Sequence, residues 1–266
     1  MENKENILKL INNLIKENIN NTINEKIEIY NAIFYKDTNA LMIASNFGLN
    51  DIVNELIEKG IDINSKDING KSAIMFAIEN NEIDTINILI NNNADINIQD
   101  KKGVTPIMWA SGNGKIEAVK LLLNNNADIN IKNTYGEKAI IWASKKNNPE
   151  IIQLLIDNGA DVNEMDEDKG NCSMWAAYNN LYDNMKVLIK NGADINKKNK
   201  EGNTSLMIAA ASYNYAIVGV LVNMGADYNI KNKEGKTAID IASARDDTSA
   251  LHHMTNPSDL EHYLSY

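Results

Sequence analysis

The chain has 266 residues, of which 44% are hydrophobic but only 6% aromatic, and its formal net charge is −10. This acidic balance argues against a protein that binds the nucleic-acid backbone, because such a protein needs a basic surface. The single cysteine, Cys172, excludes an intrachain disulfide framework and is compatible with a reducing compartment.

No run of residues approaches the roughly 18 apolar positions that a membrane span requires. The first 20 residues mix charges into every turn, so they contain no uninterrupted signal-peptide core. We therefore expect a cytoplasmic protein with no membrane partner and no nucleic-acid partner. Export by a route that needs no such signal stays open.

The N-terminal segment, residues 4–19, is predicted to form an amphipathic helix. Its apolar pairs suggest half a structural unit that caps one end of a stack. Between residues 20 and 38 the apolar residues alternate as in a strand but also fit a helix face. An enlarged hairpin and an extra short helix are both compatible with this segment, and we favour the helix slightly.

Residues 100–130 define the unit that the rest of the chain repeats. The turn DKKG ends at Gly103, and Thr105 follows as the N-cap of a helix that begins at Pro106. Gly114 is expected to end this helix in the left-handed conformation. A second helix follows, with apolar residues at helical spacing at Ile116, Val119, Leu122 and Leu123.

This unit recurs with a period of 33 residues. The N-cap position recurs at Asn39, Ser72, Lys138, Asn171, Thr204 and Thr237. An alanine lies five residues after every one of these positions, and a pair of aliphatic residues follows in the second helix of all copies but the last. A period held this strictly predicts a linear stack of helix pairs.

The period, the TPIMWA start, the aliphatic pair and the ADIN end resemble the ankyrin repeat over about residues 39–247. The resemblance implies an all-α ankyrin-repeat solenoid, in which stacked antiparallel helix pairs are joined by turn or hairpin fingers. We expect a single domain over residues 1–266. An N-terminal helical cap would occupy 1–38, six repeats 39–236, and a degenerate last repeat with a C-terminal cap 237–266.

One departure from the family pattern is general. Where the family usually has histidine after T-P-L, this chain has apolar residues, namely Met42, Met75, Met108, Ile141, Met174 and Met207. Apolar packing is therefore expected to replace the threonine–histidine hydrogen bond at this corner.

The position that ends each first helix is predicted to be left-handed. It is occupied by Gly48, Asn81, Gly114, Asn147, Asn180 and Tyr213, and glycine and asparagine tolerate this backbone best. Tyr213 is the exception, so its turn is expected either to shift to Asn214 or to be strained. Pro149 is placed to open a second helix.

All three tryptophans occupy one equivalent position, at Trp109, Trp142 and Trp175. We call this set the tryptophan column. Other copies have isoleucine or phenylalanine there, which favours a buried position. An exposed aromatic strip for a ligand is the less favoured interpretation.

The fifth repeat is irregular, because its turn DEDKG moves the glycine one place later, to Gly170. Its carboxylates at 164 and 166–168 form an acidic finger. A calcium loop is disfavoured because the EF-hand register is missing, so we expect a solvated acidic tip. In the last copy, Leu251 and Met254 are expected to complete a short final helix.

The sequence predicts neither an enzyme nor a bound cofactor or metal. The histidines His252, His253 and His262 have no supporting cysteine pair, and no phosphate loop or nucleophile motif is present. Cys172 lies two repeats from these histidines, too far to form a catalytic pair in a stack.

The resemblance implies protein recognition through a concave face made of fingers and first helices. On the positions that vary within such repeats, the predicted contact residues are Lys101, Lys102, Tyr135, Lys145, Lys146, Tyr178, Asn179, Ser212 and Arg245. The favoured function is a monomeric, non-catalytic adaptor or inhibitor of a partner protein. The alternatives are a structural or self-associating solenoid and a neutraliser of a co-encoded toxin or enzyme.

Overall fold

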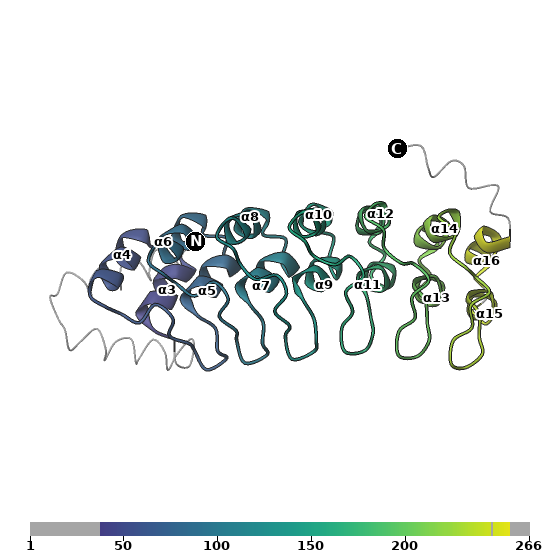
Figure 1. The fold of residues 1–266 in the computed structure, drawn as a ribbon, viewed down its shortest axis with the longest axis horizontal. Helices are drawn as coiled ribbons and strands as arrows, with labels where there is room; N and C mark the ends of the chain where they lie inside the picture. Colours follow the sequence, from purple (N-terminus) through teal and green to yellow (C-terminus); the bar gives the residue numbers. More distant parts are fainter. Residues whose placement is uncertain (1–37, 246, 256–266) are drawn as a thin grey trace. The chain divides into compact units, whose positions relative to one another are not determined.

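A computed structural model describes residues 38–245 and 247–255 (Figure 1). The predictions for residues 4–19 and 20–37 lie outside the described residues, as does His262. The chain divides into two compact units, Met1–Pro106 and Ile107–Tyr266.

From residue 38 onward, the first unit contains two helix pairs. Its helices are α3 (Ala40–Asn46), α4 (Asn50–Glu58), α5 (Ala73–Glu79) and α6 (Ile83–Asn91). The first helices α3 and α5 pack against each other, and the second helices α4 and α6 do the same. This arrangement buries the apolar side of each helix, including Leu41, Ile74 and Leu89.

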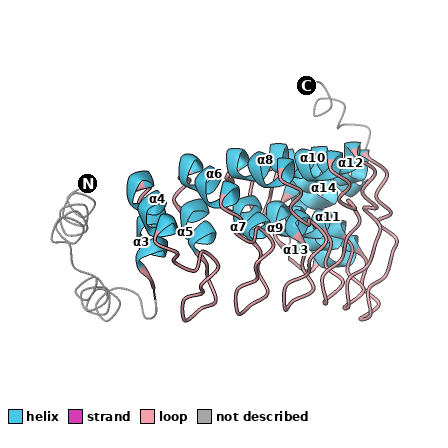
Figure 2. Cartoon of the chain, turned by 60° about the vertical axis from the view of Figure 1, so that its left-hand side comes forward, coloured by secondary structure: helices cyan, strands magenta, loops and turns pink. Residues whose placement is uncertain are grey.

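The second unit continues the pattern with five pairs. Its helices are α7 (Pro106–Gly112), α8 (Ile116–Asn124), α9 (Ala139–Ser144), α10 (Pro149–Asp157), α11 (Cys172–Tyr178), α12 (Tyr182–Lys190), α13 (Ser205–Ala211), α14 (Tyr215–Asn223), α15 (Ala238–Ser243) and α16 (Thr248–Thr255). Within this unit, the first helices lie in one row and the second helices in another, and the loops extend beyond the row of first helices (Figures 1 and 2). The short final helix predicted around Leu251 and Met254 is confirmed as α16.

The first helices begin where the sequence places their N-caps. The side chain of Asn39 accepts the N–H of Met42 at 2.9 Å, and that of Asn171 accepts the N–H of Met174 at 3.0 Å. Thr237 forms a full capping box with Asp240. Each of these bonds satisfies an amide that the helix itself leaves without a partner.

A five-residue turn precedes each first helix from the second pair onward, and we call it a finger. Its first residue is always Asp or Asn, and its side-chain oxygen accepts backbone amides within the turn. Asp100 Oδ1, for example, accepts the N–H groups of Lys102 and Val104, each at 2.8 Å. These bonds stabilise the turn without pairing into a β-sheet, because the side chain satisfies the backbone amides locally.

The finger at residues 166–170, which carries three of the four carboxylates of the acidic finger, differs from the other fingers in its backbone conformation. Glycine occupies the fourth finger position elsewhere, as at Gly136 with φ 71°, but here Lys169 takes that left-handed conformation with φ 58°. Gly170 is needed for another reason, since a Cβ there would lie 2.8 Å from Asp166 Oδ2. The shifted glycine thus leaves room for the Asp166 carboxylate.

The apolar corner predicted in place of the family's histidine is confirmed. The six residues at this position, Met42, Met75, Met108, Ile141, Met174 and Met207, are each at most 3% exposed. Methionine is flexible enough to fill the corner between neighbouring pairs.

The left-handed helix ends are confirmed at five of the six predicted positions. Gly48, Asn81, Gly114, Asn180 and Tyr213 all have positive φ. Tyr213 itself adopts φ 58°, so the turn is strained and does not shift to Asn214.

The sixth of these predictions, for Asn147, is wrong, because Asn147 is absent from the positive-φ residues. In the next pair, Leu181 N–H bonds back to Ala176 C=O at 2.9 Å, which closes the left-handed turn. In the fourth pair, α9 ends early at Ser144, and Asn148 N–H bonds instead to the Asn184 side chain at 3.1 Å. Asn148 also precedes Pro149, which disfavours the α-helical conformation at Asn148, where φ is −130° and ψ is 56°.

Over residues 38–245 and 247–255, no helix is both long enough and apolar enough to cross a lipid bilayer.

Candidate partner-binding face

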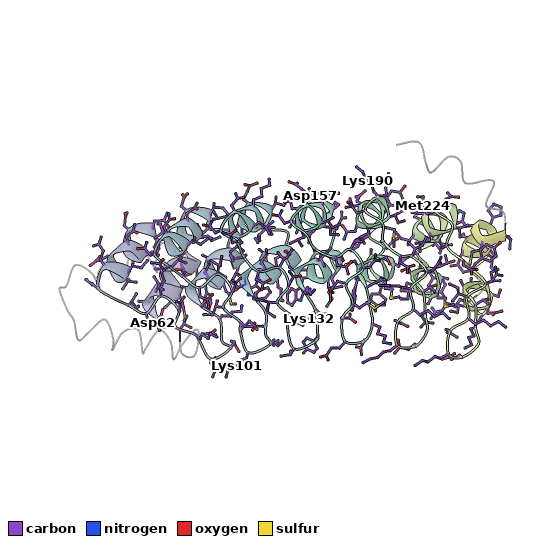
Figure 3. The ribbon with its side chains drawn as sticks, viewed as in Figure 1. Asp62, Lys101, Lys132, Asp157, Lys190 and Met224 are labelled. Carbon is purple, nitrogen blue, oxygen red and sulfur yellow. The ribbon has the colours of Figure 1, made fainter. Side chains whose placement is uncertain are left out.

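The loops and first helices of the second unit form a surface that we call the finger face. It comprises the fingers at 133–137, 166–170, 199–203 and 232–236 with helices α9, α11, α13 and α15 and the turns that end these helices. The second helices form the opposite side, where Asp157, Lys190 and Met224 lie, whereas Lys132 lies beside the fingers (Figure 3).

Three tyrosines are exposed on the finger face. Tyr135 in the fourth-pair finger is 57% exposed, Tyr178 at the end of α11 is 61% exposed, and Tyr213 after α13 is 48% exposed. Each presents a large apolar ring to solvent, which costs free energy unless a ligand covers it.

The fourth finger is held by a buried carboxylate. Glu137, only 6% exposed, accepts a hydrogen bond from Asn133 Nδ2 at 2.9 Å and forms an ion pair with Lys145 Nζ. The same ammonium group lies 4.4 Å from the ring centre of Trp175. Lys145 is therefore engaged in internal contacts and orients both the finger and the next first helix.

The tryptophan column is half-buried, so the predicted core position is only partly right. Trp109 and Trp142 meet edge to face with ring centres 6.0 Å apart. Trp175 meets Tyr178 in the same way at 6.3 Å, and its Nε1–H donates to Asp166 Oδ2 at 3.1 Å. The Nε1 edge of Trp175 thus faces the finger at 166–170, an arrangement that neither sequence interpretation described.

An open pocket of about 400 Å³ lies beside Trp175 on the finger face. Tyr178, Met174 and Ile208 give it apolar walls, and Asp166 and Asp168 give it carboxylates. The pocket is built by two neighbouring pairs, because Asn199 and Ile208 belong to the sixth repeat. The acidic finger and Trp175 were both visible in the sequence, but their convergence depends on the stacking.

The predicted contact residues fall into three groups. Lys101 and Lys102 are exposed at a finger of the first unit. Tyr135, Lys146, Tyr178, Asn179 and Arg245 are exposed on the finger face, and Ser212 and Lys145 are half-buried there. Arg245 lies 5.3 Å from the ring centre of Tyr213, and Asn179 donates back to Trp175 C=O at 3.0 Å.

The acidic finger is less solvated than its composition suggests. Glu164 is paired with Lys138 at 2.6 Å and Lys132 at 3.0 Å. Burial raises the pKa of Glu164, but the hydrogen bonds and charges of the two lysines outweigh it and leave the pKa below its usual value. Asp168 pairs with Lys200 at 2.9 Å at the exposed tip.

Potential nucleophiles and metal ligands on the described residues are separated. Burial raises the pKa of the Cys172 thiol to about 12, so the group is an unreactive part of the core. Across the part of the chain that the structure describes, no three His, Cys, Asp or Glu side chains are grouped as metal ligands. His252 and His253 lie on α16 with ring centres 6.2 Å apart.

Comparison with known proteins agrees with this architecture. A model of ankyrin repeats in three copies matches residues 2–100, 74–166 and 173–256. The human ASB11 ankyrin repeat domain is similar in structure, with a TM-score of 0.73, 24% identity, and coverage of 80% of this chain and 97% of that one.

The ankyrin repeat domain of Bcl-3, described as a unique member of the IkappaB protein family, is also similar. Its TM-score is 0.71 at 23% identity, with coverage of 82% of this chain and 100% of that one. A search of curated proteins by sequence finds no match. From the seven helix pairs in the part that the structure describes, the fingers and the match over most of its length, the chain belongs to the ankyrin-repeat family.

Proposed function

We propose that the chain is a non-catalytic adaptor or inhibitor that binds a partner protein through its finger face. Ankyrin repeats are generally protein–protein interaction modules, and this supports the class of function. The observation that supports the surface is the exposure of Tyr135, Tyr178 and Tyr213 on the fingers and the turns after the first helices.

Tyrosine suits this purpose because it combines a large apolar ring with a polar hydroxyl group. Interface hot spots are enriched in tyrosine, tryptophan and arginine, and they are surrounded by residues that exclude water. Tyr178 adjoins the pocket beside Trp175, and Arg245 adjoins Tyr213. The finger face therefore offers two aromatic anchors, each with a second hot-spot residue beside it.

Exposed charged residues, on either unit, would set orientation and association rate. Lys146 is exposed in the turn after α9, and Lys101 and Lys102 are exposed on the first unit. Exposed charges change the rate of encounter more than the lifetime of a complex. Lys145 acts differently in this proposal, because it holds Glu137 and Trp175 in place.

The test is affinity capture from the native cell with three matched baits. These are the wild-type chain, a finger-face variant with Tyr135→Ala and Tyr178→Ala, and a second-helix variant with Lys190→Ala and Met224→Ala. Met224 is 46% exposed, so the control also removes an exposed apolar side chain. All three baits should melt at similar temperatures, because no changed residue is buried.

We expect a protein that the wild-type and second-helix baits capture and the finger-face bait loses. Loss in the second-helix bait with retention in the finger-face bait would place the interface on the opposite side. Equal capture by all three baits would show that Tyr135 and Tyr178 do not contribute to the interface.

We also propose that the chain acts as a monomer. Light scattering should then give a mass near 29.6 kDa over a wide concentration range. A mass that rises with concentration, and that falls again in the finger-face variant, would instead support self-association.

A further inference from the structure

The pocket beside Trp175 combines two features that the proposed function does not use. Its aromatic walls are perpendicular, with the planes of Trp175 and Tyr178 at 86°. Two carboxylates, Asp166 and Asp168, lie at the same opening. Aromatic faces and carboxylates attract the same kind of ligand, an organic cation.

The charge of Asp166 is not neutralised by its present contacts. Its oxygens accept the N–H of Gly170 at 2.7 Å and the indole N–H of Trp175 at 3.1 Å, and both donors are neutral. Among the residues that the structure describes, no lysine or arginine forms an ion pair with Asp166. Each carboxylate oxygen can accept a further hydrogen bond.

The Trp175 ring already attracts one cation within the molecule. Lys145 Nζ, from the preceding pair, lies 4.4 Å from its ring centre. The pocket lies toward the following pair, since Asn199 and Ile208 line it and Lys145 does not. A second cation can therefore approach the indole without displacing Lys145.

The apolar surface of the pocket selects among cations. Met174 and Ile208 lie beside the rings and favour a ligand with an aliphatic stem. A hydrated metal ion would gain nothing from these residues, and an anion would be repelled by Asp166, whose charge is uncompensated, whereas Asp168 is already paired with Lys200. A volume of about 400 Å³ accommodates one long side chain.

We propose that this pocket receives one basic side chain, lysine or arginine, of the partner protein. The inference rests on the proposed function, since it names the chemistry of the partner residue that the finger face recognises. The aliphatic stem packs on Met174 and Ile208, and the charged group lies between the two rings and Asp166. Tyr178 thus acts as a wall of the pocket as well as an exposed anchor.

The test uses the isolated full-length chain and small probes, so it needs no partner. The probes are N-acetyl-arginine amide and N-acetyl-lysine amide, with N-acetyl-citrulline amide as the neutral isostere of arginine, all at matched ionic strength. The readout is the indole N–H resonance of Trp175, assigned with Trp175→Phe. Phenylalanine is tolerated at this position, since Phe76 holds it in the second repeat.

The decisive variant is Asp166→Asn. Asn133, Asn199 and Asn232 hold the same position in other fingers, so asparagine preserves the turn. The change removes the negative charge together with the Oδ2 that accepts the Trp175 indole N–H. Asp157→Asn on α10 is the matched control, because it removes one carboxylate from the opposite side (Figure 3).

We expect a saturable shift of the Trp175 resonance with at least one basic probe and none with citrulline. Asp166→Asn should weaken this binding by about fivefold or more, and Asp157→Asn should leave it unchanged. No saturable shift with either basic probe, or an equal shift with citrulline or in Asp166→Asn, would overturn the proposal. Any of these results would leave the tyrosine capture experiment unaffected, so the two proposals fail separately.

Discussion

The backbone N–H of Asn148 donates to the side-chain oxygen of Asn184 at 3.1 Å, and the Asn184 amide donates to Lys146 C=O at 2.7 Å. The buried side chain of Asn184, in the fifth pair, therefore fixes the conformation of the turn that follows the first helix of the fourth pair. In the equivalent position other pairs have Thr85, Ala118, Ile151 and Ile217. The bond from Asn148 N–H to Asn184 replaces the backbone bond that would close a left-handed turn at Asn147.

Asn184→Ala should destabilise the protein by about 1–3 kcal/mol, because it removes the partner of one amide and one carbonyl in a partly buried turn. Asn179→Ala is the control and should change stability by less than about 0.5 kcal/mol, since Asn179 is exposed. Urea unfolding followed by circular dichroism measures both. Equal shifts in the two variants would mean that the Asn184 bonds add nothing to stability.

Glycine substitution at Asn180 and at Asn147 should have opposite effects. Asn180 has φ 56°, where glycine is at least as well suited, so Asn180→Gly should be neutral or stabilising by up to about 1 kcal/mol. Asn147 lacks a positive φ, so Asn147→Gly should cost about 0.5–1 kcal/mol through lost backbone entropy. Thermal unfolding of the two variants measures both effects. A gain in stability for Asn147→Gly would show that Asn147 has a left-handed backbone after all.

How far the sequence predicts this structure can be seen at these turns. The period and the N-caps locate every described helix pair, because each repeat uses the same local bonds. The prediction of a left-handed helix end at Asn147 fails because the deciding interaction comes from Asn184. This residue belongs to the next pair, and the repeat pattern does not reveal its contact. The pocket is missed for a similar reason, since its walls come from two pairs.

The predicted contact residues show the same limit. Tyr135 and Tyr178 are exposed as predicted, because they stand at turn and helix-end positions. Lys145 holds a comparable position, but Glu137 and Trp175 draw it into internal contacts. A variable position in a repeat therefore predicts where the residue's Cα lies, but it does not predict which neighbours the side chain contacts.

Gly112→Ala should be destabilising although alanine favours helices by about 1 kcal/mol over glycine. A Cβ at this position would lie 2.7 Å from Trp142 Cε3, and overpacking costs typically about 1–3 kcal/mol. Gly112 thus makes room for the tryptophan of the next pair. Unfolding midpoints of the single variant measure the net effect.

The double variant Gly112→Ala with Trp142→Ile identifies the cause. Isoleucine is the residue at the equivalent position 208, so the helix accommodates it. The combined cost should be smaller than the sum of the single costs, since the clash disappears. Strict additivity would show that Gly112 does not contact Trp142.

The Cys172 thiol should be unreactive in the native protein. Burial raises its pKa to about 12, so very little thiolate exists at pH 8, and the side chain is fully covered. A thiol reagent should label the chain slowly at pH 8 and rapidly in denaturant, where the pKa returns to its usual range. Rapid native labelling would show that α11 opens or that the thiol is exposed.

The most direct measurement of the central claim is amide hydrogen exchange with and without the captured partner. Binding through the finger face predicts slower exchange in residues 133–137, 166–170 and 199–203 and at the end of α11, with α10, α12 and α14 unchanged. Protection confined to α10, α12 and α14, with the fingers unchanged, would contradict the account.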